Sequence, residues 1–287
     1  MKHALLATTI TLMLFGCTPT KIESTDQTTS QASTQQTITL SNLSDETSRK
    51  QMRDTLVQYL DPSSVDTVMA WIQDYNTTIE NTSLTDGFVN SEQPNYDVVQ
   101  IDKLWQAKKG WFIGTNCRLN TFMLLKNTIK IGTNTPADDR LLFLDREAVE
   151  TGKLLNAQEL QQFNQLFARV ATDATTDVTV HAKKMQAQFA NIRLDDTATM
   201  LSVVMHDNLD GDYLFIGHVG VLVPAKTGYL FLEKLSFQEP YQAIQFASKD
   251  AAYDYLLNKY AIDYNQPTAQ PFIMENDKLV RWVKDST

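Results

Sequence analysis

The chain has 287 residues, of which 43% are hydrophobic, and this length allows one large folded domain or two small ones. Its formal net charge is −9, and no cluster of Lys and Arg residues is interleaved with aromatic residues. This composition excludes the basic surface with which proteins usually bind nucleic acids, so no nucleic-acid partner is expected. The same negative charge is repelled by anionic lipids, so charge does not hold the protein to a membrane.

The start of the chain has the pattern of a bacterial export signal. Lys2 gives a positive charge, and residues 4–13 form an apolar segment too short to span a bilayer. The next four residues resemble a lipobox and read Leu14-Phe15-Gly16-Cys17, with a phenylalanine bulkier than the usual residue. The resemblance implies a signal peptide over residues 1–16 and a new N-terminus at Cys17, acylated with palmitate-type chains. The alternative is an ordinary secretory signal with an incidental cysteine.

The segment after the lipobox predicts a tether. Residues 17–36 are dominated by Thr, Ser and Gln, so they bury too little apolar surface to fold. A single domain is expected over residues 37–287, and no later run is long and apolar enough to span a membrane. Together these features predict a domain held by lipid on the extracytoplasmic face of a bacterial membrane.

The first two thirds of this domain have mainly helical periodicity. Residues 37–43 alternate and predict a short first strand, and Asp-Pro-Ser-Ser at 61–64 ends the first helix. Loops are expected over 81–95 and 133–140. Further helices are expected over residues 44–60, 65–79, 97–107, 145–149, 157–170 and 177–192, in addition to one that begins at Cys117.

The helix that begins at Cys117 carries the most distinctive pattern. Asn116 is a good N-cap, and a thiol in the first turn lies in the positive field of the helix N-terminus, which favours the thiolate. The helix is apolar on more than one side, so it is expected to be buried. If Cys17 is lipidated, Cys117 is the only remaining thiol and a candidate nucleophile. The alternative is a structural cysteine packed in the core.

The last third predicts antiparallel strands over residues 197–206, 213–223 and 229–237, a helix over 248–260 and a last hairpin over 272–283. The acidic segment between the first two strands slightly resembles a calcium loop, but Leu209 and Gly211 occupy positions where ligands are needed. An Asp-Gly hairpin turn is the better interpretation. A metal site formed by His206, Asp207 and Asp212 is the weakest hypothesis, and no metal or other cofactor is expected.

Two charged or polar residues interrupt the apolar strands. His218 lies between Gly217 and Gly220, and a buried histidine is costly unless it is paired. Glu233 lies on the next strand, where a hairpin brings it close to His218. Whether the two share a face depends on a register that the sequence leaves open. The alternatives are a satisfied core histidine and a surface glutamate that pairs with Lys234 or another cation.

Several short motifs resemble a family of bacterial lipoproteins known as a domain of unknown function, over about residue 37 to the end. They are Asn116-Cys117-Arg118, Gly217-His218-Val219-Gly220-Val221-Leu222, Glu233-Lys234-Leu235-Ser236-Phe237-Gln238-Glu239-Pro240-Tyr241 and Ala269-Gln270-Pro271-Phe272-Ile273. More distantly, the order is similar to that of NlpC-type cysteine peptidases and amidases. That resemblance implies Cys117 as nucleophile, His218 as base and Glu233 as the orienting group. The residues that flank the cysteine differ from the usual Asp-Cys-Ser/Gly, and 101 residues separate Cys117 from His218.

The resulting prediction is an α+β domain, helical first, with an antiparallel sheet packed on the Cys117 helix in a papain-like or NlpC-like arrangement. One functional hypothesis is a cysteine hydrolase of peptide or amide bonds, with peptidoglycan peptide as substrate. Asn116 or the Cys117 N–H then stabilises the oxyanion, and Arg118 either binds a substrate carboxylate or points to solvent. The alternative is a non-catalytic binding lipoprotein. Its candidate ligand contacts are Trp111, Tyr241 and Phe237.

Overall fold

The computed structural model describes residues 38–91, 94–131, 137–193, 198–262 and 266–283. The expected signal peptide, lipid attachment site and tether lie outside these residues. Within the described ranges, no helix combines the length and apolarity needed to cross a membrane.

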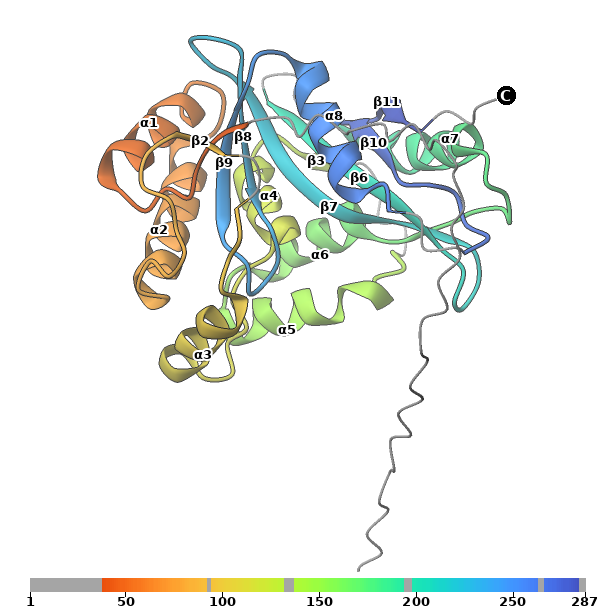
Figure 1. The fold of residues 1–287 in the computed structure, drawn as a ribbon. Coiled ribbons are helices and arrows are strands. Elements are labelled where there is room, and N and C mark those ends of the chain that lie inside the picture. Colours follow the sequence, from red (N-terminus) through yellow and green to blue (C-terminus); the bar gives the residue numbers. More distant parts are fainter. Residues whose placement is uncertain (1–37, 92–93, 132–136, 194–197, 263–265, 284–287) are drawn as a thin grey trace, which may run out of the picture. The chain divides into compact units, whose positions relative to one another are not determined.

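An antiparallel sheet of nine strands forms the centre of the described residues (Figure 1). The strands are β1 (Ile38–Ser41), β2 (Val89–Ser91), β4 (Val170–Ala171), β6 (Thr199–Asp207), β7 (Tyr213–Pro224), β8 (Tyr229–Lys234), β9 (Tyr241–Phe246), β10 (Phe272–Glu275) and β11 (Lys278–Trp282). Their order is β11-β10-β6-β7-β8-β9-β1-β2, and β4 pairs with β7. A second small sheet joins β3 (Lys130–Ile131) to β5 (Ile192–Arg193).

Most of the helices begin at side chains that cap free backbone N–H groups. They are α1 (Glu46–Leu56), α2 (Pro62–Thr78), α3 (Val98–Lys109), α4 (Cys117–Leu125), α5 (Phe143–Gly152), α6 (Ala157–Phe167), α7 (Val178–Phe189) and α8 (Lys249–Tyr260), with a short 3-10 turn, η1 (Arg140–Leu142), before α5. The caps of α1, α2, α3 and α7 are Asp45, Asp61, Asp97 and Asp177. Asn156 forms a capping box with Glu159 at α6. Local sequence therefore sets most of the helix starts.

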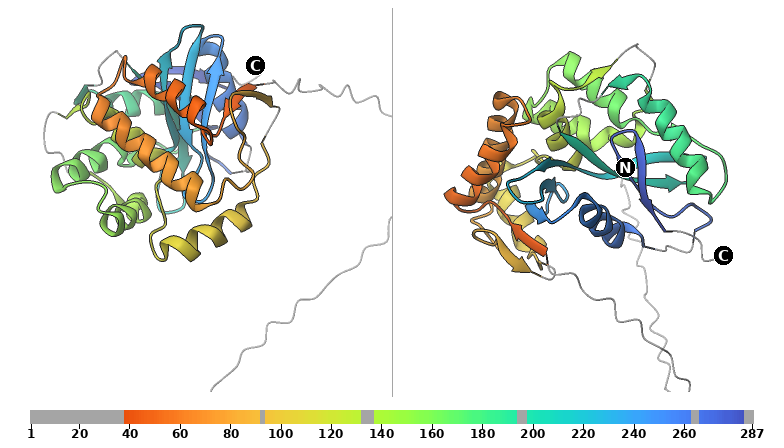
Figure 2. Two further views of the ribbon diagram at one scale, coloured as in Figure 1. Left: turned by 90° about the vertical axis from the view of Figure 1, so that its left-hand side faces the viewer. Right: turned by 90° about the horizontal axis from the view of Figure 1, so that it is seen from above.

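Alternating residues of the central strands face two separate cores. Val221 and Leu232 belong to the core that contains α4, whereas Leu222 and Phe231 pack with residues of α8. Figure 2 shows α8 on one side of the sheet and the helices α5 to α7 on the other. The candidate cysteine and the C-terminal helix thus approach the sheet from opposite faces.

The α+β fold expected from the sequence is confirmed, with helices concentrated in the first two thirds and a large antiparallel sheet after them. The helix that begins at Cys117 packs against β7 and β8, as expected. The first strand, the three predicted strands of the last third and the hairpin of β10 and β11 are all present. The strand expected over 229–237 ends at Lys234, and the helix expected over 157–170 ends at Phe167.

Besides the two-residue strands β3, β4 and β5, two strands were not expected from the sequence. The first, β2, has only three residues and pairs with β1 inside the predicted loop of residues 81–95. The second, β9, contains Gln242 and Gln245, which interrupt its apolar pattern. Gln242 is nevertheless 2% exposed, because its side chain donates to the Tyr96 hydroxyl at 2.8 Å. A tertiary hydrogen bond thus allows a polar residue into the sheet.

Candidate active site

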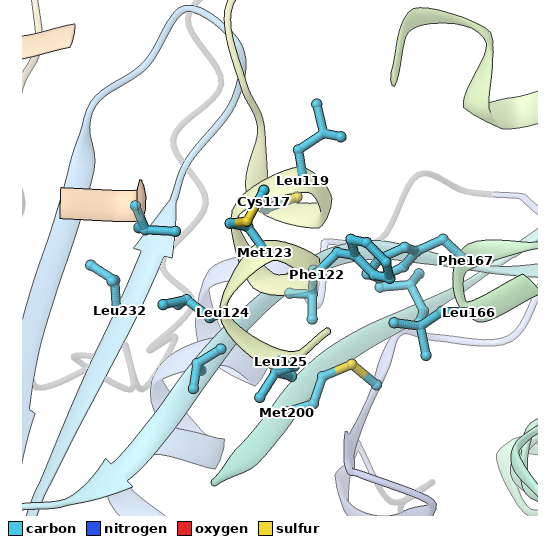
Figure 3. Close-up of a cluster of buried hydrophobic side chains, with 14 of the residues drawn as sticks. Cys117, Leu119, Phe122, Met123, Leu124, Leu125, Leu166, Phe167, Met200 and Leu232 are labelled. Carbon is cyan, nitrogen blue, oxygen red and sulfur yellow. The ribbon is translucent and has the colours of Figure 1, made fainter. Parts of the chain in front are cut away.

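Cys117 occupies the first turn of a buried helix. The Oδ1 atom of Asn116 accepts a hydrogen bond from the Leu119 N–H at 3.0 Å, and the extended backbone of Asn116 turns the chain into α4. Figure 3 shows Leu124 directed towards Leu232 and Leu125 beside Met200. This packing fixes the helix against the sheet. Cys117 itself is 6% exposed.

His218 and Glu233 lie on the same face of neighbouring strands. The register of β7 and β8 places Glu233 opposite Gly220, two residues from His218. Residues two apart on a strand share a face, so the two side chains meet diagonally. The His218 Nε2 atom lies 2.6 Å from the Glu233 Oε2 atom, and both residues are almost fully buried. The register that the sequence left open is therefore the one that pairs them.

A bulge in β7 precedes His218. Val203 is opposite His218 and Val204 is opposite Ile216, so Gly217 is the extra residue. A Cβ at Gly217 would collide with the side chain of Met205 on β6. The bulge re-aims the strand immediately before the histidine, and a larger residue at position 217 would require the Met205 side chain to move.

Cys117 and His218 lie close enough to shift each other's pKa values, and the shifts have the directions of an ion pair. Burial raises the pKa of the Cys117 thiol, but the hydrogen bond and charge of His218, together with Arg118, bring it below the ordinary value. Burial lowers the pKa of His218, yet Cys117 and Glu233 raise it to about 9. Since Nε2 is bonded to Glu233, Nδ1 is the nitrogen left for the thiol. At neutral pH this favours thiolate and imidazolium.

Glu233 has two further partners, both from α8. Its Oε1 atom accepts from the Tyr255 hydroxyl at 2.7 Å and lies 3.3 Å from the Lys259 Nζ atom. Burial alone would raise the pKa of Glu233, but Lys259, His218 and Tyr255 lower it to about 2. The Tyr260 ring stacks on the imidazole of His218, with ring centroids 4.8 Å apart.

Asp145 of α5 braces the two residues that flank the cysteine. Its carboxylate is fully buried and accepts from the Asn116 Nδ2 atom at 2.7 Å. The guanidinium of Arg118 donates to both carboxylate oxygens, from Nε at 3.0 Å and from Nη2 at 2.7 Å. The Asn116 side chain, expected to help stabilise an oxyanion, is thus engaged at both ends. Arg118, expected to meet either substrate or solvent, forms an ion pair and is 17% exposed at its side chain.

Tyr241, one of the expected ligand contacts, lies in the core. It is 1% exposed, and its hydroxyl is bonded to the side chains of Thr115 and Asn120, each at 3.0 Å. A side chain this deeply buried is not available to a ligand in this structure. It instead holds the loop that precedes Cys117 in place.

Trp111 and Phe237 do line a shared cavity, of about 410 Å³, together with Trp105, Phe112, Ile113, Asp102, Gln106, Gly110 and Gln238. Trp111 is 92% exposed. Gly114 packs against the Trp105 ring and the Phe237 carbonyl oxygen, with φ of +91°, which favours glycine. Gly114 thus links this cavity to the loop that leads to Cys117.

Arg118 lines a second cavity, of about 440 Å³, and His206 and Asp207 line it as well. His206 uses both ring nitrogens, since Nδ1 accepts from the Ala269 N–H at 3.0 Å and Nε2 lies 3.1 Å from Asp212. Among the described residues no group of three His, Cys, Asp or Glu side chains is placed to hold a metal ion. The metal site considered around His206 therefore has no assembled ligand set in this part of the chain.

Sequence reasoning missed Asp145, Tyr255 and Lys259 as members of the site. Asp145 follows the apolar residues 141–144. An acid next to an apolar run can be buried, and a buried carboxylate needs a paired cation or hydrogen-bond donor. Tyr255 and Lys259 are four residues apart and therefore share one face of α8. Neither pattern is specific, and only the tertiary contacts connect them to Cys117 and His218.

Comparisons with known proteins place the chain in a family. The family called Domain of unknown function (DUF4300) matches residues 39–280, which is most of the chain and includes Cys117, His218 and Glu233. No curated protein and no solved structure matches the chain. The protein belongs to the DUF4300 family.

Proposed function

We propose that this protein is a cysteine hydrolase that cleaves peptide or amide bonds. The observation that carries the proposal is the convergence of Cys117, at a helix N-terminus, with the hydrogen-bonded pair His218 and Glu233 on two neighbouring strands. A nucleophile, a base and a group that orients the base are the three parts that covalent hydrolysis requires. Because the three residues come from positions far apart in sequence, their meeting supports the functional interpretation over incidental burial.

The proposed reaction begins with attack of the Cys117 thiolate on a carbonyl carbon. A carbon–sulfur bond forms, and the negative charge that develops on the carbonyl oxygen is stabilised by the Cys117 N–H at the start of α4. His218 then donates its proton to the departing amine, and the carbon–nitrogen bond breaks. Water, deprotonated by His218, hydrolyses the thioester and restores the thiolate–imidazolium pair. Glu233 holds the imidazole throughout.

The order of the three residues resembles that of NlpC-type enzymes, in which a cysteine opens a helix and a histidine and a polar residue follow on strands. That similarity supports amide hydrolysis. The lipobox-like Cys17 and the polar tether support a lipid-anchored protein on the extracytoplasmic face of a bacterial membrane. Peptidoglycan peptide is the amide polymer that such a protein meets, so we propose it as the substrate.

A non-catalytic binding lipoprotein is the second candidate. The burial of Cys117 and His218, and the exposed Trp111 beside a cavity, favour this function. It also expects Cys117 to be remote from His218, whereas each of the two residues shifts the pKa of the other. The hydrolase is therefore the better-supported proposal.

The test is release of new amino groups from purified peptidoglycan and from peptide amides by the full chain. Wild type is compared with Cys117→Ala and His218→Ala, and His206→Gln serves as the control for a histidine on the adjacent strand. The proposal expects wild type and His206→Gln to release amino groups, and Cys117→Ala and His218→Ala to release none. Equal release by Cys117→Ala, or no release by any protein together with saturable binding of the wall polymer, would replace the hydrolase with the binding protein.

A further inference from the structure

A buried carboxylate stays charged only where cations and hydrogen-bond donors surround it. Glu233 is 2% exposed, and each of its oxygens has a donor. One oxygen faces the His218 Nε2 atom, and the other faces both the Tyr255 hydroxyl and the Lys259 Nζ atom. The Lys259 Nζ atom also donates to the Tyr255 hydroxyl at 2.8 Å. Both partners of this oxygen therefore come from α8 and contact each other.

We infer that Lys259 and Tyr255 are positioning residues of the candidate active site, which hold Glu233 charged and oriented towards His218. The two residues belong to α8, whose core lies on the face of the sheet opposite to that of α4. The site is thus assembled across the sheet, with the nucleophile supplied from one face and the support of the orienting group from the other. This inference rests on the proposed hydrolase.

Charge balance gives the physical reason. With the thiolate, the imidazolium, the carboxylate and the ammonium present, two negative and two positive charges cancel in a nearly closed space. Without Lys259 the group carries one net negative charge, so every remaining proton is held more tightly. The thiolate of Cys117 is then harder to form. Lys259 keeps 27% of its side chain exposed, so its own charge remains partly hydrated.

Other titratable groups also face this set and must stay unchanged in the test. Arg118 and Asp145 lie on the side of Cys117. Lys234 follows Glu233 on β8, and its charge also acts on Cys117. Tyr96 and Tyr260 lie near the carboxylate of Glu233.

The experiment measures alkylation of Cys117 by iodoacetamide against pH, in the full chain, with the modified peptide identified by mass spectrometry. The variants are Lys259→Met, Lys259→Arg and Tyr255→Phe. Lys249→Met is the matched control, because Lys249 is on the same helix and forms an ion pair with Glu275 at 2.5 Å, away from the site. Thermal unfolding of each variant separates loss of stability from a change in the thiol.

We expect the alkylation curve of Lys259→Met to move to higher pH, with a rate at pH 7 on the order of tenfold lower, as one pKa unit gives. Lys259→Arg restores the curve because it restores the charge, and Lys249→Met leaves it in place. Tyr255→Phe moves it in the same direction by less, and it remains informative if Lys259→Met does not fold.

Two results would overturn the inference, and they differ. If wild-type Cys117 titrates below an ordinary thiol but neither Lys259→Met nor Tyr255→Phe moves the curve more than Lys249→Met, the two residues only stabilise the fold, and the hydrolase proposal stands. If wild-type Cys117 reacts as an ordinary thiol or only after unfolding, the proposed function itself fails and the inference fails with it.

Discussion

Replacing His218 with alanine removes the group that lowers the pKa of the Cys117 thiol. Burial lowers the pKa of His218, but Cys117 and Glu233 raise it from 6.5 to about 9. This rise corresponds to about 3 kcal/mol. Because the coupling between two ionising groups is reciprocal, the part contributed by Cys117 equally stabilises the thiolate.

In the His218→Ala variant, burial still raises the pKa of the thiol while its main counter-charge is gone. We expect the pKa to rise by roughly one to two units, since Glu233 contributes part of the energy in the wild type. Alkylation of Cys117 at pH 7 then falls by roughly 10- to 100-fold. The rate of wild type increases as the pH rises through the thiol pKa, which lies below that of an ordinary thiol.

The assay is the pH dependence of iodoacetamide alkylation, with Cys117 followed by mass spectrometry so that Cys17 does not contribute. His206→Gln is the control, because His206 is also buried in the sheet but bonds Asp212 and the Ala269 backbone. The reasoning is refuted if His218→Ala titrates at the same pH as wild type while both remain folded.

Three further predictions concern the residues around the site. Since Glu233 has a pKa of about 2 in the folded protein against 4.5 when unperturbed, it contributes about 3 kcal/mol of stability above pH 4.5, which is lost as the pH falls towards 2. Urea unfolding at pH 7 and pH 3 should show about 2 kcal/mol of this loss in wild type and a smaller loss in Glu233→Gln. Equal losses would contradict the prediction. Asp145→Ala leaves the Arg118 charge without its partner and should destabilise the protein by about 3–5 kcal/mol in urea unfolding, whereas a change below about 1 kcal/mol would mean that water replaces the carboxylate. Trp111→Ala should change the free energy of unfolding by no more than about 0.5 kcal/mol, since the side chain is 92% exposed. It should raise KM for the peptidoglycan peptide, and an unchanged KM would remove Trp111 from the substrate contacts.

Local sequence determined the start of the candidate site. Asn116 caps α4 through a bond to a backbone N–H three residues on, and the apolar residues that follow bury the helix. These features act within a few residues of the chain, so the sequence alone predicts a cysteine in the first turn of a buried helix. The alternation of side chains between the two faces of β6 and β7 is also a local property, because side chains on a strand have a period of two.

The tertiary structure decided which of the candidate residues meet. The sequence placed His218 and Glu233 on neighbouring strands, but only the pairing of Gly220 with Glu233 puts them on one face, and a slip of one residue would separate them. The same holds for Tyr241, which the sequence presented as a ligand contact and the packing of α4 buries.

Asp145 and Lys259 show why the remaining partners were out of reach of sequence reasoning. Asp145 is 27 residues from Arg118, and Lys259 is 26 residues from Glu233. A capping residue or an apolar period acts through neighbours along the chain, so the sequence records it directly. An ion pair between distant elements depends on how helices dock on the sheet, and that docking is fixed only when the whole core forms.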